Sequence, residues 1–378
     1  MKKKIILSVG SLLAIGVVAG VSVINLTSCG FSNIKYVMHR GLSSRHFENT
    51  KESFEAAGKL NSTWGIETDI YLTKTDASPI SPLSSHPLVC AHGVNPFRQV
   101  DKTERDAGWT NRPEQNAYHA GECNPSPSAY DPLWDPYYFA TAPGSGGYRI
   151  TDNTYAAIKD KKLWTGYCGY SPIDGGGQYE VMSNDHNAYG IKGNYTVPLF
   201  SDYLKICKEY NKEAVIEIKD ENAFWGSDYA STLMNELLAD AIAVGWVDHC
   251  TIITFDGAIF DPTKDPLALP FYSALRTISE GSPNQTQSAA KKMLTKFQKL
   301  IWSDYDHDVP SAEAYWAIGK GLNVDVDKSV LLAPGGKDII KFAHENDLIV
   351  NTWTVNDETE RDQLIKLGVD QVSTNCTF

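Results

Sequence analysis

Two acidic residues near the start of the chain stand two positions apart in a short apolar segment. Glu67 and Asp69 lie in the run 66–70, IETDI, and side chains two apart on a β-strand point to the same face. Two carboxylates on an inner face repel each other and are costly to remove from water, and a bound cation would remove that cost. The alternative is a half-buried strand that shows its acids to solvent.

The triplet His39-Arg40-Gly41 lies upstream of these acids and favours the cation site. It follows the apolar residues Tyr36–Met38 and precedes an amphipathic run, Ser53–Leu60. The order over residues 36–73 is therefore strand, turn, helix and strand. In an α/β barrel the polar residues at the strand ends carry the chemistry, and these acids and this triplet occupy such positions.

Other expected strands also end in polar residues, and together they indicate one reaction class. Hard oxygen ligands without a Cys or multi-His cluster predict Ca²⁺ or Mg²⁺ rather than zinc. Arg40 and Lys219 would complement a phosphate beside that cation, and two histidines could take and give a proton at phosphorus. We therefore predict metal-assisted phosphodiester cleavage. The strand-end set is His39, Arg40, Glu67, Asp69, His92, Glu217, Lys219, Asp256, Trp353 and Asn356. Asp256 is a turn former or supports its neighbours, and we leave it out of the catalytic set.

Short apolar strands alternate with helical segments along the chain. Eight strands, mostly followed by helices, predict parallel pairing, right-handed crossovers and a closed TIM (β/α)8 barrel. The expected strands are Tyr36–Met38, Ile66–Leu72, Leu88–Ala91, Ala214–Lys219, Thr251–Asp256, Leu300–Trp302, Ile349–Asn356 and Gln371–Thr374. The expected helices are Ser53–Leu60, Pro198–Tyr210, Tyr229–Gly245, Gln287–Lys299, Asp338–Asn346 and Thr359–Leu367.

The segment 95–195 interrupts this alternation. It is rich in Gly, Pro, Asn and aromatic residues and shows little periodicity. A structureless loop of that length is improbable in a compact domain, so we interpret it as an inserted, loop-rich subdomain that caps the barrel.

The N-terminus has the pattern of a targeting segment. Lys2–Lys4 are basic, Ile5–Ile24 is apolar, and Leu26-Thr27-Ser28-Cys29 resembles a bacterial lipobox. We expect residues 1–28 to be a signal peptide, Cys29 to carry a lipid, and residues 29–378 to lie on the extracellular face of the cell membrane. The alternative is an uncleaved transmembrane anchor, since the apolar stretch is long enough to span a bilayer.

The net charge argues against one class of partner, and the cysteine positions indicate which thiols are buried. A net charge of −12 argues against a nucleic-acid partner, because phosphate-backbone binding needs a basic surface. Cys90, Cys207 and Cys250 lie in or beside apolar segments and are expected to be buried hydrophobes. Cys123 and Cys168 could form a disulfide outside the cell.

Five motifs, in order, resemble the glycerophosphodiester phosphodiesterase family. They are His39-Arg40-Gly41, Glu48-Asn49-Thr50 with Ser53-Phe54, Glu67-x-Asp69 with Leu72-Thr73-Lys74, Glu217-Ile218-Lys219 and Trp353-Thr354-Val355-Asn356. Gly368-Val369-Asp370 fits as well. The resemblance implies a TIM barrel that uses a divalent cation to hydrolyse glycerophosphodiesters, such as glycerophosphocholine, to sn-glycerol 3-phosphate and an alcohol.

Carried over by motif, the resemblance also assigns residue roles. Glu67, Asp69 and Glu217 would be metal ligands, and His39 and His92 the acid–base pair. Arg40, Lys219 and Trp353 would bind the phosphate or substrate.

The chain departs from the family pattern at two strand ends. The usual His-Asp after the third strand is His92-Gly93 here, which leaves His86 and His186 as alternatives, and the usual terminal Thr-Asp is Thr374-Asn375. Two other functions therefore stay open. One is phospholipase D-like cleavage of lysolipid or sphingolipid head groups, and the other is a non-catalytic surface binder on the same barrel.

Overall fold

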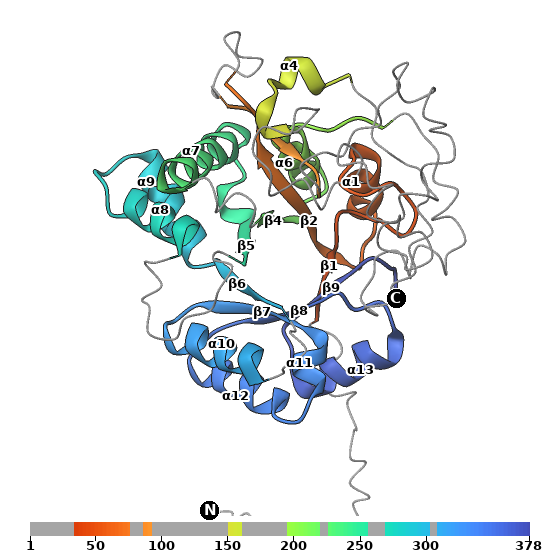
Figure 1. Ribbon diagram of the computed structural model, residues 1–378. Coiled ribbons are helices and arrows are strands. Elements are labelled where there is room, and N and C mark those ends of the chain that lie inside the picture. The colour runs from red at the N-terminus through yellow and green to blue at the C-terminus, as the bar shows by residue number, and fades with distance from the viewer. Residues whose placement is uncertain are drawn as a thin grey trace, which may run out of the picture.

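The fold is an eight-stranded parallel barrel with helices around it (Figure 1). The computed structural model describes residues 34–75, 86–92, 150–160, 195–219, 226–255, 269–302 and 308–378. Strand order around the barrel is β1-β2-β4-β5-β6-β7-β8-β9, and pairing of β9 with β1 closes it. The barrel strands are β1 Lys35–Met38, β2 Thr63–Leu72, β4 Glu213–Ile218, β5 Cys250–Thr254, β6 Gln298–Ile301, β7 Asn323–Asp327, β8 Val350–Trp353 and β9 Gln371–Thr374.

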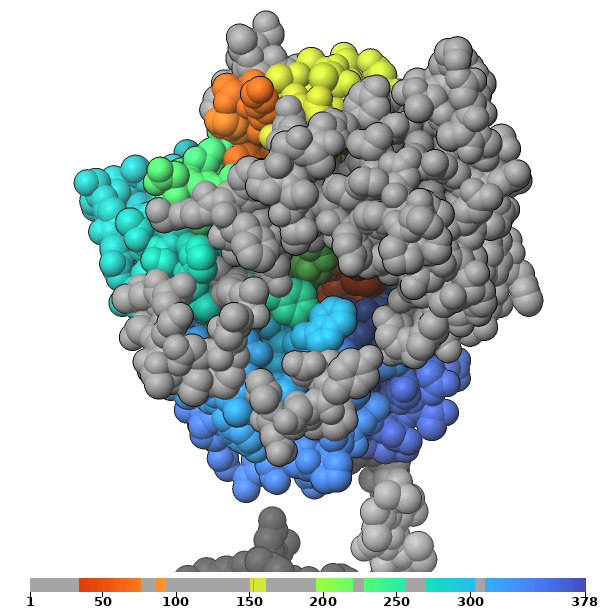
Figure 2. Space-filling view, viewed as in Figure 1, coloured from red at the N-terminus to blue at the C-terminus, as the bar shows by residue number. Residues whose placement is uncertain are grey.

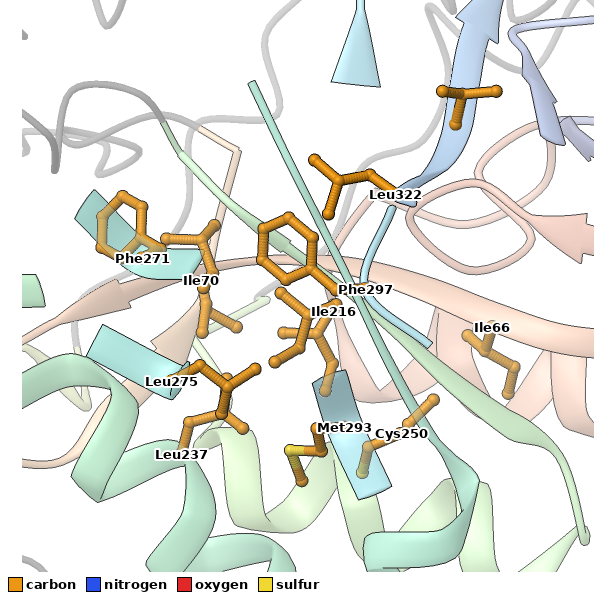
Figure 3. Packing of buried hydrophobic residues seen from close by; sticks show 14 of the residues in the cluster. Ile66, Ile70, Ile216, Leu237, Cys250, Phe271, Leu275, Met293, Phe297 and Leu322 are labelled. Atoms are coloured by element: carbon orange, nitrogen blue, oxygen red, sulfur yellow. The ribbon is translucent and has the colours of Figure 1, made fainter. Parts of the chain in front are cut away.

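The helices bury the outer faces of these strands. Ile66, Ile70 and Ile216 point outward from β2 and β4, and Figure 3 shows them among side chains of the helices that cover the sheet, such as Leu237 and Leu275. Each such side chain contributes roughly 1.5–3 kcal/mol when fully buried. The described helices are α1 Lys51–Gly58, α4 Tyr155–Ile158, α6 Phe200–Glu209, α7 Gly226–Val244, α8 Pro270–Ser279, α9 Gln285–Leu294, α10 Asp308–Gly319, α11 Lys328–Leu332, α12 Gly336–Glu345 and α13 Glu358–Leu367, with short 3₁₀ turns η5 Ile150–Asp152 and η8 Val247–His249.

The predicted TIM barrel is confirmed, but one expected strand lies outside the barrel wall and one wall strand was missed. Leu88–Cys90 forms β3, which pairs antiparallel with the outer end of β2 and takes no place in the barrel wall. The seventh wall strand is β7, Asn323–Asp327, which was missed. Its sequence, NVDVD, places two acids and an amide on the face opposite its valines, so it lacks the apolar run used to recognise the others. The predicted count of eight was right because these two errors cancel.

β2 and β3 together form a two-stranded ribbon that continues beyond the barrel. Tyr71, Val89 and Ala91 of this region pack with Ile150 and Ile158 into a small buried cluster. These two isoleucines belong to the segment 95–195, so this part of the predicted insertion packs on the ribbon. The division into an N-terminal targeting segment, barrel and cap subdomain stays a prediction. Cys29, Cys123, Cys168 and His186 lie outside the described residues.

Three cysteines behave as the sequence predicts. Cys90, Cys207 and Cys250 are free thiols with no exposed surface, and burial raises the pKa of each. Among the described residues, no helix combines the length and apolar character needed to cross a membrane.

The helix α7 carries a buried carboxyl group that should make folding stability depend on pH. Burial and the neighbouring Glu236 raise the pKa of Asp240 to about 7. In the unfolded chain Asp240 ionises above about pH 4, whereas in the folded protein it keeps its proton up to about pH 7. Stability is therefore lost as the pH rises through this window. We expect Asp240→Asn to raise the free energy of unfolding at pH 8 by about 3 kcal/mol relative to its effect at pH 4.

Urea unfolding at pH 4, 6 and 8 would measure this difference. Glu345→Gln, on the exposed side of α12, is the matched control and should give the same change at every pH. Equal effects of Asp240→Asn at pH 4 and pH 8 would contradict the prediction.

Candidate active site

The turn after β1 begins the site. Arg40 and Gly41 both have positive φ, 57° and 78°, so the chain reverses sharply after His39. A Cβ on Gly41 would lie 2.5 Å from the Ser53 hydroxyl oxygen, so the turn packs directly against α1. Glycine is required here because any larger residue would collide with Ser53 as well as strain the backbone.

The tripeptide Glu48-Asn49-Thr50 links this turn to β2 through side-chain hydrogen bonds. Glu48 accepts a hydrogen bond from the Arg40 guanidinium at 2.9 Å. The Asn49 amide donates to an Asp69 carboxylate oxygen at 2.8 Å and accepts from the Asp69 backbone N–H. Thr50 caps α1 in a capping box with Ser53. Three consecutive residues thus position an arginine, a carboxylate and a helix.

Three buried carboxylates meet at the ends of β2 and β4. The parallel register pairs Asp69 with Glu217, and Glu67 lies two residues earlier on the same face of β2. One oxygen from each of Glu67, Asp69 and Glu217 lies within 4.8 Å of the others. The Arg40 backbone N–H donates to Glu67 Oε2 at 2.7 Å, while Glu67 Oε1 is buried without a hydrogen-bond partner.

Two cationic side chains offset part of this negative charge. Lys219 Nζ lies 2.6 Å from an oxygen of Asp69 and 2.6 Å from an oxygen of Glu217. Arg40 Nε lies 3.3 Å from Asp69. When all four carboxyl groups, counted with Glu48, are ionised, the two cations leave the site two positive charges short.

These features fit a hard divalent cation. Its charge would balance the site, and the buried Glu67 oxygen supplies a free lone pair among closely spaced carboxylates. Glu67, Asp69 and Glu217 are the residues that could hold it.

His39 is held by an amide at the end of β9. Its Nδ1 lies 2.8 Å from the Asn375 side-chain oxygen, so Nδ1–H donates and Nε2 is left as the acceptor. The backbone N–H of Asn375 in turn donates to Asn356 at 3.0 Å. Burial and the Arg40 charge lower the pKa of His39 to about 3, so the imidazole is neutral at neutral pH.

His92 reaches the same group of residues from β3. Its Nδ1 lies 3.9 Å from Glu48, and the backbone N–H of Ala91 donates to the Asp69 carbonyl at 3.0 Å. Burial, followed by the Arg40 and Lys219 charges, lowers the pKa of His92 well below its usual value. His86 instead lies against Thr75 at the outer end of the ribbon.

Trp353 lies on another side of the barrel mouth. Its indole N–H donates to the Asp325 carbonyl at 3.2 Å, so a substrate would meet the ring rather than the N–H.

Figure 2 shows the surface of the molecule from the same side as Figure 1. A hollow near the middle of this face is bordered by brown-red, green and blue parts of the chain.

Comparisons with known proteins agree with this geometry. A profile of the "Glycerophosphoryl diester phosphodiesterase family" matches residues 39–377. The chain belongs to this family. It is therefore a glycerophosphodiester phosphodiesterase enzyme. A search of curated protein sequences found no match.

Solved structures of family proteins share the fold. A protein assigned to the family from Silicibacter pomeroyi has a TM-score of 0.52 and 16% identity, with 92% of this chain and 91% of that one covered. One from Galdieria sulphuraria has a TM-score of 0.51 and 16% identity, with 90% and 94% covered. A glycerophosphodiester phosphodiesterase from Parabacteroides distasonis has a TM-score of 0.50 and 15% identity, with 91% and 93% covered.

The structure brings together most of the site residues expected for this phosphodiesterase. One cluster contains His39, Arg40, Glu67, Asp69, His92, Glu217 and Lys219. Trp353 takes no part in the ion pairs of this cluster. Asp256 lies outside the described residues. The sequence motifs that contain Glu48, Asn49 and Asn356 were recognised, but the roles of these residues were not predicted. For Glu48, the available signal was a carboxylate in a motif close to His39-Arg40-Gly41. Asn375 was noted only as a departure, yet its side chain holds His39.

Cation binding by the phosphodiesterase should depend on pH. Burial raises the pKa of Glu217 to about 7, and burial with the Asp69 charge raises the pKa of Glu67 well above its usual value. A cation requires both groups ionised, so protons compete with it below about pH 7. We expect the Ca²⁺ dissociation constant to rise about tenfold per pH unit for each of the two protons displaced, with proton release on binding.

Calorimetric titration of Ca²⁺ in two buffers of different ionisation heat would count these protons. Glu217→Gln should lower the affinity at least about tenfold, since a charged ligand is lost. The exposed Glu358→Gln on α13 serves as the control. The same affinity at pH 5.5 and pH 8 would show that the three carboxylates do not hold the ion.

Proposed function

We propose that this enzyme hydrolyses glycerophosphodiesters, such as glycerophosphocholine, to sn-glycerol 3-phosphate and an alcohol with the help of Ca²⁺ or Mg²⁺. The observation that carries the proposal is the cluster at the barrel mouth. It combines three mutually close carboxylates, two cations and two histidines. A bound divalent cation would offset the excess negative charge, and Arg40 and Lys219 could then donate charge-assisted hydrogen bonds to a phosphodiester.

Arg40 and Lys219 hold the phosphate in this proposal. Both now pair with carboxylates, so a substrate oxygen would share these donors. A divalent cation on Glu67, Asp69 and Glu217 would polarise the phosphoryl oxygen and stabilise charge that develops there. The guanidinium and the ammonium then orient the diester against the histidines.

His39 and His92 divide the proton transfers. His39 is neutral, and its Nε2, which lies 4.0 Å from Glu67 Oε2, is the unprotonated nitrogen that a general base requires. It takes the proton of the attacking hydroxyl, and His92 gives a proton to the leaving alcohol. Binding of the anionic diester would raise the low pKa of His92 and so let it hold that proton. We propose that the attacking group is the substrate's own 2-hydroxyl, because an internal nucleophile has little entropy left to lose. Water then opens the cyclic phosphate.

Release of glycerol 3-phosphate from glycerophosphocholine tests this scheme. The protein from Phe31 onward should be active with Ca²⁺ or Mg²⁺ and inactive with EDTA. His39→Ala and His92→Ala should each lower kcat by at least about 100-fold, since each removes one proton transfer. His86→Ala is the matched control, because its ring lies at the outer end of the ribbon, and it should retain activity.

The outcomes separate the alternatives. Loss of activity in His39→Ala alone would remove His92 from the mechanism. An intact protein that binds Ca²⁺ but releases no product would favour a non-catalytic binder. Release of head groups from lysolipids, with none from glycerophosphodiesters, would favour phospholipase D-like cleavage.

We also propose that Cys29 carries a lipid that anchors the enzyme to the extracellular face of the membrane. The support is the lipobox-like run ending at Cys29 after an apolar stretch. Cys29→Ala should move the protein from the membrane fraction to the medium or leave the precursor unprocessed, because no acyl chain can be attached. Mass spectrometry of the mature N-terminus would reveal the lipid. An unmodified Cys29 in a chain that keeps residues 1–28 would point to a transmembrane anchor.

A further inference from the structure

Three aromatic side chains form a second surface at the barrel mouth. Phe255, Trp302 and Trp353 follow or end the strands β5, β6 and β8. Their ring centroids are 5.9 Å apart for Phe255 and Trp302, 5.7 Å for Phe255 and Trp353, and 5.3 Å for the two tryptophans. We call these three residues the aromatic triad.

The aromatic triad packs on the barrel interior on one side and exposes Trp302 to solvent on the other. Phe255 and Trp353 pack on Ile253 and Leu300, which fill the barrel interior. The Trp353 indole N–H is bound to the Asp325 carbonyl, so this ring has a set orientation. Trp302, in contrast, has 57% of its surface exposed, although a large aromatic side chain gains from burial. An exposed indole on a rigid base offers an apolar and electron-rich surface to a ligand.

Strand register places this surface beside the phosphate-binding lysine. Ile218 of β4 pairs with Thr254 of β5, so Lys219 and Phe255 are the next residues along two neighbouring strands. Neighbouring strands lie about 4.8 Å apart. A phosphodiester on Lys219 and Arg40 therefore has one substituent within reach of the aromatic triad.

We propose that the aromatic triad binds the quaternary ammonium of a choline head group, which makes choline esters the preferred substrates. This inference rests on the proposed function. A quaternary ammonium carries a positive charge that ring faces attract, and its methyl groups make apolar contact without hydrogen bonds. A primary ammonium such as that of ethanolamine must give up hydrogen bonds to water at the same surface, and a glycerol head group has no charge to attract.

Substrate comparison with Trp302 variants tests the preference. The wild-type enzyme should show a kcat/KM for glycerophosphocholine at least fivefold above that for glycerophosphoethanolamine. Trp302→Leu should lower the value for the choline ester about tenfold and that for the ethanolamine ester less than twofold. Trp302→Phe keeps a ring and should retain most of the preference. The control is Tyr315→Leu on α10, which removes another exposed aromatic ring and should leave kcat/KM for both esters unchanged.

A binding experiment separates this inference from the reaction itself. Calorimetry with the His39→Ala protein would give dissociation constants for both esters without turnover, and Trp302→Leu in that background should abolish the choline preference. If the choline preference persists in binding while no ester is hydrolysed by the intact enzyme, the proposed function fails and the aromatic triad stands. If both esters are hydrolysed at equal kcat/KM and Trp302→Leu affects them equally, the choline inference is wrong and the reaction stands.

Discussion

Burial of closely spaced carboxylates is the constraint around which the barrel mouth is built. Glu67, Asp69 and Glu217 are almost fully removed from water, and isolated charges in such a place would be very costly. Lys219 bridges Asp69 and Glu217, and the backbone N–H of Arg40 donates to Glu67. The remaining negative charge is the feature that fits a divalent cation. The same buried negative charge therefore lowers the stability of the fold and provides ligands that fit a cation.

Neutral amides transmit this arrangement to the rest of the fold. Asn49 binds both the side chain and the backbone of Asp69, and so holds the carboxylate without adding charge. Asn356 receives the backbone N–H of Asn375, whose side chain orients His39. Asn49 donates to the Asp69 carboxylate and accepts from the Asp69 backbone N–H, and an ionised acid at this position could not donate. Burial and the Arg40 charge lower the pKa of His39 more than Asp69 and the Asn375 hydrogen bond raise it, so the imidazole is neutral.

Sequence patterns could predict the barrel and most of the charged cluster because both follow local rules. The alternation in 66–70 places Glu67 and Asp69 on one face, and β2 obeys it over ten residues. The pattern failed at β7, where the inward-facing Asn323 and Asp325 disguise a buried strand, and at β3, where an apolar triplet pairs outside the barrel. The aromatic triad was invisible for another reason. Phe255, Trp302 and Trp353 come from separate strands, and only the closed barrel brings their rings into contact.

The antiparallel ribbon gives the two histidines different mechanical support. His39 follows β1, which is paired on both sides and belongs to the closed wall. His92 follows a strand of three residues that pairs with β2 on one edge and is held on the other by a single bridge to Leu199 and a hydrogen bond to the Pro198 carbonyl. Short elements with few neighbours open at lower free energy than a closed barrel. The two histidines therefore lie on separate structural units, one on the closed wall and one on the ribbon. A substitution that shifts the ribbon should move His92 and leave His39 in place.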